Sequence, residues 1–210
     1  MKRNSFINMN VDIKKEYQER YKKYGLDPKS LLWKSRGAAH QRFRQFWAEI
    51  DFNGKSVLDI GCGFGELGKF LLKKYKNVDY TGIDIVPEFI ENAKSMVPGG
   101  NFFVADFMKD NLNGPYDAVV ASGVLNSNKG SQNLEYRKIA IKKMFELTSN
   151  VLAFNMLGSH PAPTNKKDSN TWYSDSLDLL EYCMSLTRRV ILRANYHPKD
   201  FTIFMYRVNK

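Results

Sequence analysis

From residue 56 onward, short hydrophobic runs alternate with stretches whose apolar positions recur every three or four residues. The short runs predict buried strands and the longer stretches predict helices, and their alternation is typical of a parallel sheet built from βα units. The predicted strands are 56–60, 80–85, 101–105, 118–121, 151–156, 190–193 and 201–206. The predicted helices are 66–75, 87–95, 134–147 and 177–186, and either Ser174 or Asp175 would cap the last of them.

The two ends of the chain depart from this alternation. Residues 194–200 are too few for a crossover helix, so the last two strands should form an antiparallel hairpin. Residues 1–50 carry aromatic side chains at helical spacing on both sides of a Gly-Leu-Asp-Pro interruption. We therefore expect an N-terminal helical cap over 1–50 and an α/β domain over 51–210, separated by a turn near Asn53 and Gly54.

Composition restricts the class of protein. The chain has 210 residues, 43% of them hydrophobic and 26% charged, as expected for one ordinary globular domain with a short appendage. Cys62 and Cys183 lie far apart, without the spacing of a zinc site or a disulfide framework. The sequence begins without the apolar core of a signal peptide and contains no run long enough for a spanning helix. We expect a cytoplasmic protein with no metal site and no membrane contact.

The net charge is unevenly distributed. The chain holds 32 Lys and Arg against 22 Asp and Glu, a formal charge of +10. Residues 1–50 contribute 12 − 5 = +7 of this and the remainder contributes 20 − 17 = +3. A basic surplus permits a nucleic acid or another anionic partner. Any such contact would therefore involve the N-terminal cap.

The strongest chemical signal is the stretch SVLDIGCGFGELGKF at residues 56–70. A hydrophobic strand containing Asp59 leads into Gly61, Gly63 and Gly65 and then into a helix. Glycines in this place let a ligand lie against the backbone at the carboxyl edge of a sheet. Residues 63–68 also fit the G-x-G-x-x-G dinucleotide pattern, but the Asp59 carboxylate would repel a pyrophosphate and suits an ammonium or sulfonium group.

Two further acids follow the next two strands. Asp84 lies 19 residues beyond Gly65, where an acid can accept hydrogen bonds from both ribose hydroxyls. Asp106, with Phe107 beside it, suits an exocyclic amine, although a helix N-cap is the alternative for this aspartate. Acids at three successive strand ends indicate a ligand that contains a nucleoside.

The motifs VLDIGCGFGELG, YTGIDIVPEFIENAK, FFVADF and YDAVVASGVLN resemble those of the class I S-adenosylmethionine-dependent methyltransferases over residues 55–207. The resemblance implies a Rossmann-like sheet of seven mostly parallel strands in the order 3-2-1-4-5-7-6, with the last strand antiparallel and helices on both faces. It implies S-adenosylmethionine as cofactor and S-adenosylhomocysteine as product. The residues implied are Asp59, Gly61, Cys62, Gly63 and Gly65 around the methionine part, Asp84 at the ribose, Ile85, Asp106 and Phe107 at the adenine, and Ser122 near the amino-acid end or the acceptor.

A second similarity concerns residues 32–46, which resemble the pre-strand helix of small methyltransferases. In that helix a basic residue can reach the cofactor carboxylate, and Arg36 and Arg42 are the candidates here. A solvated face of a basic helix explains both arginines equally well.

The acceptor side should be formed by the segments after strands four and five and by the final hairpin. The candidate residues there are Asn126, Asn155, His160, Tyr173 and His197, and the stretch 158–173 would form a loop over the acceptor. His160 and His197 are the candidate general bases, with a structural or merely exposed histidine as the alternative. The segment after strand four lacks an Asn-Pro-Pro-Tyr motif and the chain lacks a Pro-Cys nucleophile, which counts against methylation of nucleobases.

Three functions stay open from the sequence. The first is a methyltransferase that modifies an oxygen or nitrogen atom of a small molecule. The second is an RNA or ribonucleoprotein methyltransferase whose basic, aromatic N-terminal segment grips phosphates and stacks on bases. The third is a non-catalytic protein that only binds S-adenosylmethionine. The oligomeric state is not predicted.

Overall fold

The computed structural model describes residues 2–33, 35–164 and 170–208, with side chains from residue 13 onward. By contacts the chain divides into two compact units, Met1–Asn111 and Leu112–Lys210. Each unit combines parallel strands with helices, as the alternating pattern predicts. The part of the predicted loop at 165–169 lies outside the described residues.

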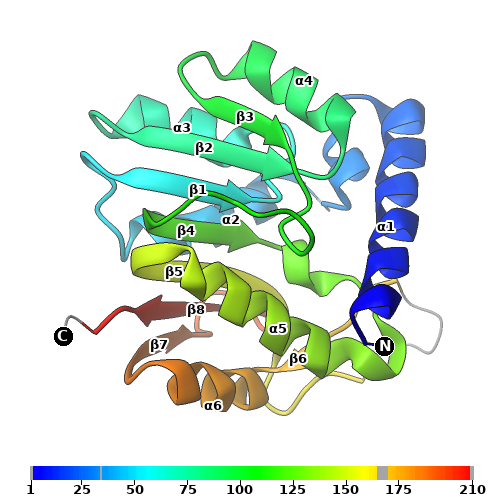
Figure 1. The fold of residues 1–210 in the computed structure, drawn as a ribbon, viewed down its shortest axis with the longest axis vertical. Coiled ribbons are helices and arrows are strands. Elements are labelled where there is room, and N and C mark those ends of the chain that lie inside the picture. Colours follow the sequence, from blue (N-terminus) through cyan, green and yellow to red (C-terminus); the bar gives the residue numbers. More distant parts are fainter. Residues whose placement is uncertain (1, 34, 165–169, 209–210) are drawn as a thin grey trace. The chain divides into compact units, whose positions relative to one another are not determined.

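The described residues of unit 1 form three parallel strands and four α-helices. Its elements are α1 (Lys2–Tyr24), the short 3-10 helix η1 (Pro28–Leu31), α2 (Arg36–Trp47), β1 (Ser56–Ile60), α3 (Glu66–Lys74), β2 (Asp79–Asp84), α4 (Pro87–Met96) and β3 (Asn101–Val104). The strands lie side by side in the order β3-β2-β1 (Figure 1). The hydrophobic runs of β1 and β2 are nearly continuous because helices cover parallel strands on both faces.

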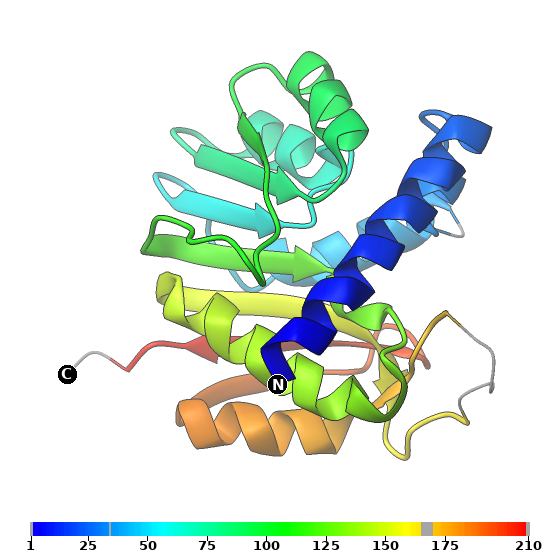
Figure 2. The same cartoon turned by 45° about the vertical axis from the view of Figure 1, so that its right-hand side comes forward.

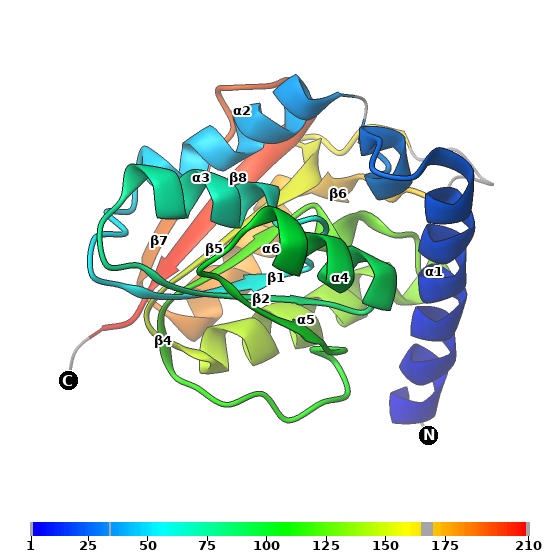
Figure 3. The same ribbon diagram turned by 90° about the horizontal axis from the view of Figure 1, so that it is seen from above.

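The N-terminal helices use their aromatic residues for packing within unit 1. Figure 2 shows α1 as one long helix, and η1 follows it before α2 begins. Tyr17 packs edge-on against Phe89 of α4, with 6.0 Å between ring centroids. Trp47 of α2 stacks on Phe70 of α3 at 3.7 Å, and the two helices lie beside each other in Figure 3. These rings therefore have partners inside the protein, which removes much of the basis for assigning them to base stacking.

Unit 2 contains the remaining strands and two α-helices. Its elements are β4 (Tyr116–Ser122), the 3-10 helices η2 (Val124–Asn126) and η3 (Gly130–Gln132), α5 (Asn133–Glu146), β5 (Thr148–Ser159), β6 (Ser174–Asp175), α6 (Ser176–Leu186), β7 (Arg189–Arg193) and β8 (Asp200–Tyr206). The strand order is β4-β5-β8-β7, and β7 and β8 form the expected antiparallel hairpin. The strand β5 extends beyond the predicted 151–156 at both ends, and the two-residue strand β6 was not predicted.

The observed topology confirms the predicted fold class. The orders β3-β2-β1 and β4-β5-β8-β7 correspond to 3-2-1 and 4-5-7-6, because β7 and β8 are the sixth and seventh predicted strands. Among the described residues of each unit, the strand pairs are parallel except those made by β8. The four predicted helices begin and end within one residue of their predicted limits, and Asp175 caps α6 by accepting from the Leu177 N–H. Within the described part of the chain, no helix is long and apolar enough to cross a membrane.

Candidate functional site

The three glycines after β1 form a tight turn that ends at the first residue of α3. Gly61, Gly63 and Gly65 have φ angles of 72°, 54° and 78°, a region that side chains with a Cβ disfavour. A Cβ on Gly63 would also lie 3.0 Å from the Leu31 side chain. Gly65 is the N-cap of α3 and supplies no side-chain oxygen, so N–H groups of the first turn of α3 stay available at the positive end of the helix dipole.

The carboxylate of Asp84 fastens this glycine turn to the end of β2. Its Oδ2 atom accepts a hydrogen bond from the Gly63 N–H at 3.0 Å, and Oδ1 accepts one from the Val86 N–H at 3.0 Å. Burial raises the pKa of Asp84 to about 6, although the backbone N–H groups act to lower it. Each carboxylate oxygen has a second lone pair, so Asp84 keeps the capacity to accept hydrogen bonds from a diol.

Asp59 is held differently from Asp84. It is buried, and its Oδ2 atom accepts a 2.5 Å hydrogen bond from the hydroxyl of Tyr80 on β2. Burial raises the pKa of Asp59 to about 7, against the effect of this hydrogen bond. The adjacent Cys62 is also buried, and burial raises the pKa of its thiol. A role of Asp59 and Cys62 beside a methionine moiety stays a prediction.

A cavity of about 210 Å³ lies at the carboxyl ends of β2 and β3 in unit 1. Its lining residues are Lys14, Ile85, Val104, Ala105, Asp106, Lys109 and Asp110. Ile85 and Asp106 are two of the residues that the resemblance assigns to adenine, whereas Phe107 is buried and is not among the lining residues. Asp106 also accepts from the Met108 N–H at 3.0 Å, so it serves as the cap of a turn as well as part of the cavity wall.

The two candidate arginines of the N-terminal segment, Arg36 and Arg42, lie in different environments. The Arg36 Nε atom lies 3.6 Å from Oε1 of Glu66, the first residue of α3, and the side chain is 59% exposed. The Nε atom of Arg42 is buried, and among the described residues it has no hydrogen-bond partner. A buried donor without a partner costs about 1–3 kcal/mol. Arg42 is therefore the arginine that gains most from an anionic ligand.

On the acceptor side, unit 2 brings Ser122 and Asn155 together. The Ser122 hydroxyl donates to Oδ1 of Asn155 at 3.1 Å across the β4–β5 pair. Asn155 is fully buried, and its Nδ2 atom has no hydrogen-bond partner within the described structure. Asn126 has a structural contact instead: its Oδ1 atom accepts a hydrogen bond from the Leu157 N–H at 2.9 Å, which holds the segment after β4 against β5. Tyr173 is partly buried just before β6.

The two candidate bases have different surroundings. His160 follows β5, and its Nδ1 atom lies 3.0 Å from Oδ1 of Asp175. The Nδ1 atom of His197 accepts from the Lys199 N–H at 3.1 Å and lies 3.5 Å from Oδ2 of Asp200. A neutral His197 therefore carries its proton on Nε2 and has no lone pair available for a ligand. A neutral His160 that donates from Nδ1 to Asp175 keeps a free lone pair on Nε2.

Four residues with defined roles, two in each unit, were missed in the sequence. Tyr80 and Lys14 were read only as parts of a strand and a helix, and Asp175 only as a helix cap. Arg137 of α5 was not singled out, yet it is fully buried and donates from Nε to the Leu125 carbonyl oxygen at 2.9 Å. The sequence gives no sign of its burial, because Arg137 stands between Tyr136 and Lys138, and its partners Leu125, Ser127 and Asn133 lie in the segment that leads from β4 into α5.

The comparisons with known proteins agree with these features. A family model described as a methyltransferase domain matches residues 58–150. The chain is 28% identical to Rv1506c of Mycobacterium tuberculosis, a protein named as a methyltransferase, over 71% of this chain and 92% of that protein. It is 37% identical to the malonyl-acyl-carrier-protein O-methyltransferase of Acetivibrio thermocellus, but over 35% of this chain and only 28% of that enzyme.

A solved structure extends the similarity to the fold. The magnesium protoporphyrin IX methyltransferase of Synechocystis, solved with S-adenosylhomocysteine bound, superposes with a TM-score of 0.63. The superposition covers 81% of this chain and 84% of that one at 17% sequence identity, a level at which it shows a shared fold. The family model over residues 58–150, the matching motifs and the shared topology together support the class I S-adenosylmethionine-dependent methyltransferase family for this chain.

Proposed function

We propose that the protein transfers the methyl group of S-adenosylmethionine to an oxygen or nitrogen atom of a small-molecule acceptor. The observation that carries the proposal is the position of Asp84. Its carboxylate is fixed by the N–H groups of Gly63 and Val86, and the neighbouring residue Ile85 lines the 210 Å³ cavity in the same unit. This arrangement offers acceptors for two ribose hydroxyls beside an apolar wall for the adenine.

Groups in unit 1 suit the ribose, the adenine and the carboxylate of this cofactor. Gly63 has a φ angle of 54°, and a Cβ there would lie 3.0 Å from the Leu31 side chain, so the turn disfavours any residue other than glycine. The unpartnered Nε atom of Arg42 suits the cofactor carboxylate, and this assignment takes precedence over Arg36, which Glu66 already neutralises. When bound, S-adenosylmethionine supplies an electrophilic methyl group, so the protein has to hold the acceptor in line with the carbon–sulfur bond and exclude water.

A small acceptor is favoured over RNA. The relatives include enzymes named for malonyl-acyl-carrier protein and for magnesium protoporphyrin IX. The aromatic residues Tyr17, Tyr21 and Trp47, which would stack on bases in an RNA-binding segment, instead contact Phe89, Phe64 and Phe70. The basic surplus of the N-terminal segment is then a property of its solvated surface.

Binding of the cofactor is tested by calorimetry with S-adenosylhomocysteine. Asp84→Ala should weaken the affinity at least tenfold, because two charge-assisted hydrogen bonds are worth more than about 1.4 kcal/mol. Asp79→Ala is the matched control, since Asp79 is an exposed acid at the other end of the same strand. Equal affinities of the Asp84→Ala variant and the wild type would refute the cofactor assignment.

Transfer is tested by incubation with methyl-labelled S-adenosylmethionine and an extract of the producing cells, separated into small molecules, RNA and protein. Label in the small-molecule fraction supports the proposal. Label confined to RNA would replace it with the RNA hypothesis. Tight binding of the cofactor without transfer to any fraction would identify a binding protein.

A further inference from the structure

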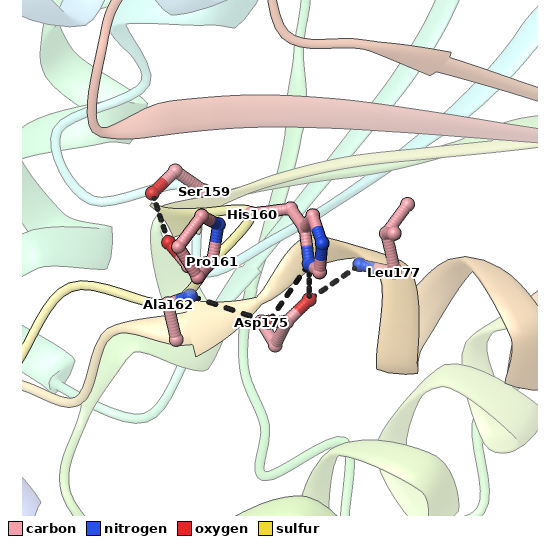
Figure 4. Close-up of polar contacts among 6 residues, drawn as sticks. All are labelled: Ser159, His160, Pro161, Ala162, Asp175 and Leu177. Carbon is pink, nitrogen blue, oxygen red and sulfur yellow. Dashed lines mark hydrogen bonds and ion pairs between the residues drawn. The ribbon is translucent and has the colours of Figure 1, made fainter.

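A histidine and an aspartate meet where β5 and β6 end in unit 2. The strands pair in parallel, with Gly158 opposite Ser174 and Ser159 opposite Asp175, and His160 is the first residue after β5. The His160 Nδ1 atom lies 3.0 Å from Oδ1 and 3.1 Å from Oδ2 of Asp175, as Figure 4 shows. Ligands of open α/β sheets bind at the carboxyl ends of parallel strands, which is the edge that this pair occupies.

Asp175 is fixed by the backbone on both sides. It accepts hydrogen bonds from the Leu177 N–H at 2.9 Å and from the Ala162 N–H at 3.2 Å (Figure 4). Burial acts to raise the pKa of Asp175, but the hydrogen bonds from His160, Leu177 and Ala162 outweigh it and the pKa is lowered. The carboxylate is therefore charged at neutral pH and cannot rotate away from the imidazole without losing these bonds.

This geometry sets the tautomer of His160. A carboxylate accepts but does not donate, so the neutral ring carries its proton on Nδ1 and has a lone pair on Nε2. The side chain of His160 is 55% exposed, which leaves Nε2 open to a ligand. Among the residues that the structure describes, Asp175 is the charged group in contact with His160.

We propose that His160 and Asp175 form the proton-accepting pair of the methyl transfer, with His160 as the general base and Asp175 as its positioning residue. The inference rests on the proposed function and narrows the acceptor to a group whose nucleophilic atom arrives with a proton, a hydroxyl or an ammonium. A carboxylate such as that of a malonyl group has lost its proton at neutral pH and needs no base.

The reaction of a hydroxyl acceptor is a single displacement at the methyl carbon. The O–H proton passes to Nε2 of His160, the acceptor oxygen forms a bond to the methyl carbon, and the carbon–sulfur bond breaks with its electron pair returning to sulfur. The imidazolium formed is stabilised by Asp175 and releases its proton to solvent. An ammonium acceptor reacts in the same way after losing one proton.

The first experiment measures turnover with labelled S-adenosylmethionine and the small-molecule extract. His160→Ala should lower kcat by about 10²- to 10⁴-fold, while the affinity for S-adenosylhomocysteine stays that of the wild type. Asp175→Asn keeps the helix cap but removes the charge, and it should lower kcat less and move the acidic limb of the pH profile to lower pH. Asp178→Asn is the matched control, because Asp178 is an exposed acid in the first turn of the same helix.

The second experiment identifies the class of the product. Mild alkali hydrolyses a methyl ester to labelled methanol but leaves an ether or a methylamine intact. Label that resists alkali supports the inference, and label released as methanol overturns it. An unchanged kcat in His160→Ala would also overturn it while leaving the proposed function standing.

The third experiment needs no acceptor. Long-range proton–nitrogen NMR should find the neutral His160 ring protonated at Nδ1 in the wild type and redistributed toward Nε2 in Asp175→Asn. A wild-type ring protonated at Nε2 would refute the pair even if no fraction of the extract accepts a methyl group. Absence of any transfer by the wild-type protein refutes the proposed function and the inference together.

Discussion

The hydroxyl of Tyr80 donates a 2.5 Å hydrogen bond to Oδ2 of Asp59, and both side chains are buried. The two residues lie on the neighbouring strands β1 and β2, immediately behind the glycine turn. Gly68 makes room for the tyrosine ring, since a Cβ on Gly68 would lie 2.6 Å from it. Tyr80 thus supplies the donor that the buried carboxylate of Asp59 needs.

Removing this donor should destabilise unit 1 in a pH-dependent way. Asp59 has a pKa of about 7 in the folded chain against an ordinary value of 3.8, so its ionisation opposes folding as the pH rises through 7. Tyr80→Phe should lower the free energy of unfolding by about 1–3 kcal/mol at pH 8 and by less at pH 5, where Asp59 is protonated. Urea denaturation at both pH values measures the difference. Tyr75→Phe is the control, and an equal loss in both variants would contradict the assignment.

Binding of S-adenosylhomocysteine should depend on the ionisation of Asp84. Its pKa is about 6, and only the charged form accepts hydrogen bonds at all its lone pairs. Affinity should therefore be highest above pH 7 and fall by up to about tenfold for each pH unit below 6. Calorimetry between pH 5 and pH 8 tests this. In Asp84→Asn the affinity should be low and nearly constant, and persistence of the full pH dependence would point to another group.

Gly158 should not tolerate a side chain. Its φ angle is +155°, and a Cβ there would lie 2.2 Å from the carbonyl oxygen of Ser174. Gly158→Ala should therefore separate β6 from β5, destabilise the protein by about 2 kcal/mol or more, and detach Asp175 from His160. Thermal unfolding and hydrogen exchange at residues 174–177 measure these effects. Gly99→Ala is the control, because Gly99 has a φ of +93° but open space around it.

Arg137 should be essential for the segment between β4 and α5. Its guanidinium donates to the carbonyl oxygens of Leu125, Ser127 and Asn133, and burial lowers its pKa to about 10. Arg137→Ala leaves these oxygens unpaired, with an expected loss of about 2–5 kcal/mol in urea denaturation. Arg137→Lys should recover only part of it, because an ammonium lacks the planar fork. Lys142→Ala, on the exposed face of the same helix, should change little.

Much of the fold was predictable because its signals are local. A strand, a glycine turn and a helix follow one another within residues 56–74. Wherever one face of an element is buried, the spacing of its hydrophobic residues along the chain distinguishes a helix from a strand. The strand β6 was missed because two residues carry no period, and its pairing depends on a glycine on β5. The extra length of β5 was missed because its ends contain polar residues that a pattern of buried strands excludes.

The candidate site residues were likewise predictable from the sequence only in part. The sequence by itself determined which acids and glycines follow the strands, because parallel strands bring their carboxyl ends to one edge. Only the tertiary structure decided their partners: Tyr80 binds Asp59, Glu66 neutralises Arg36 and not Arg42, and Asp175 orients His160. Those partners lie 15 to 30 residues apart in the chain. The spacing of hydrophobic residues indicates which face of a helix or strand is buried. Which side chains contact that face depends on how neighbouring elements are aligned with one another.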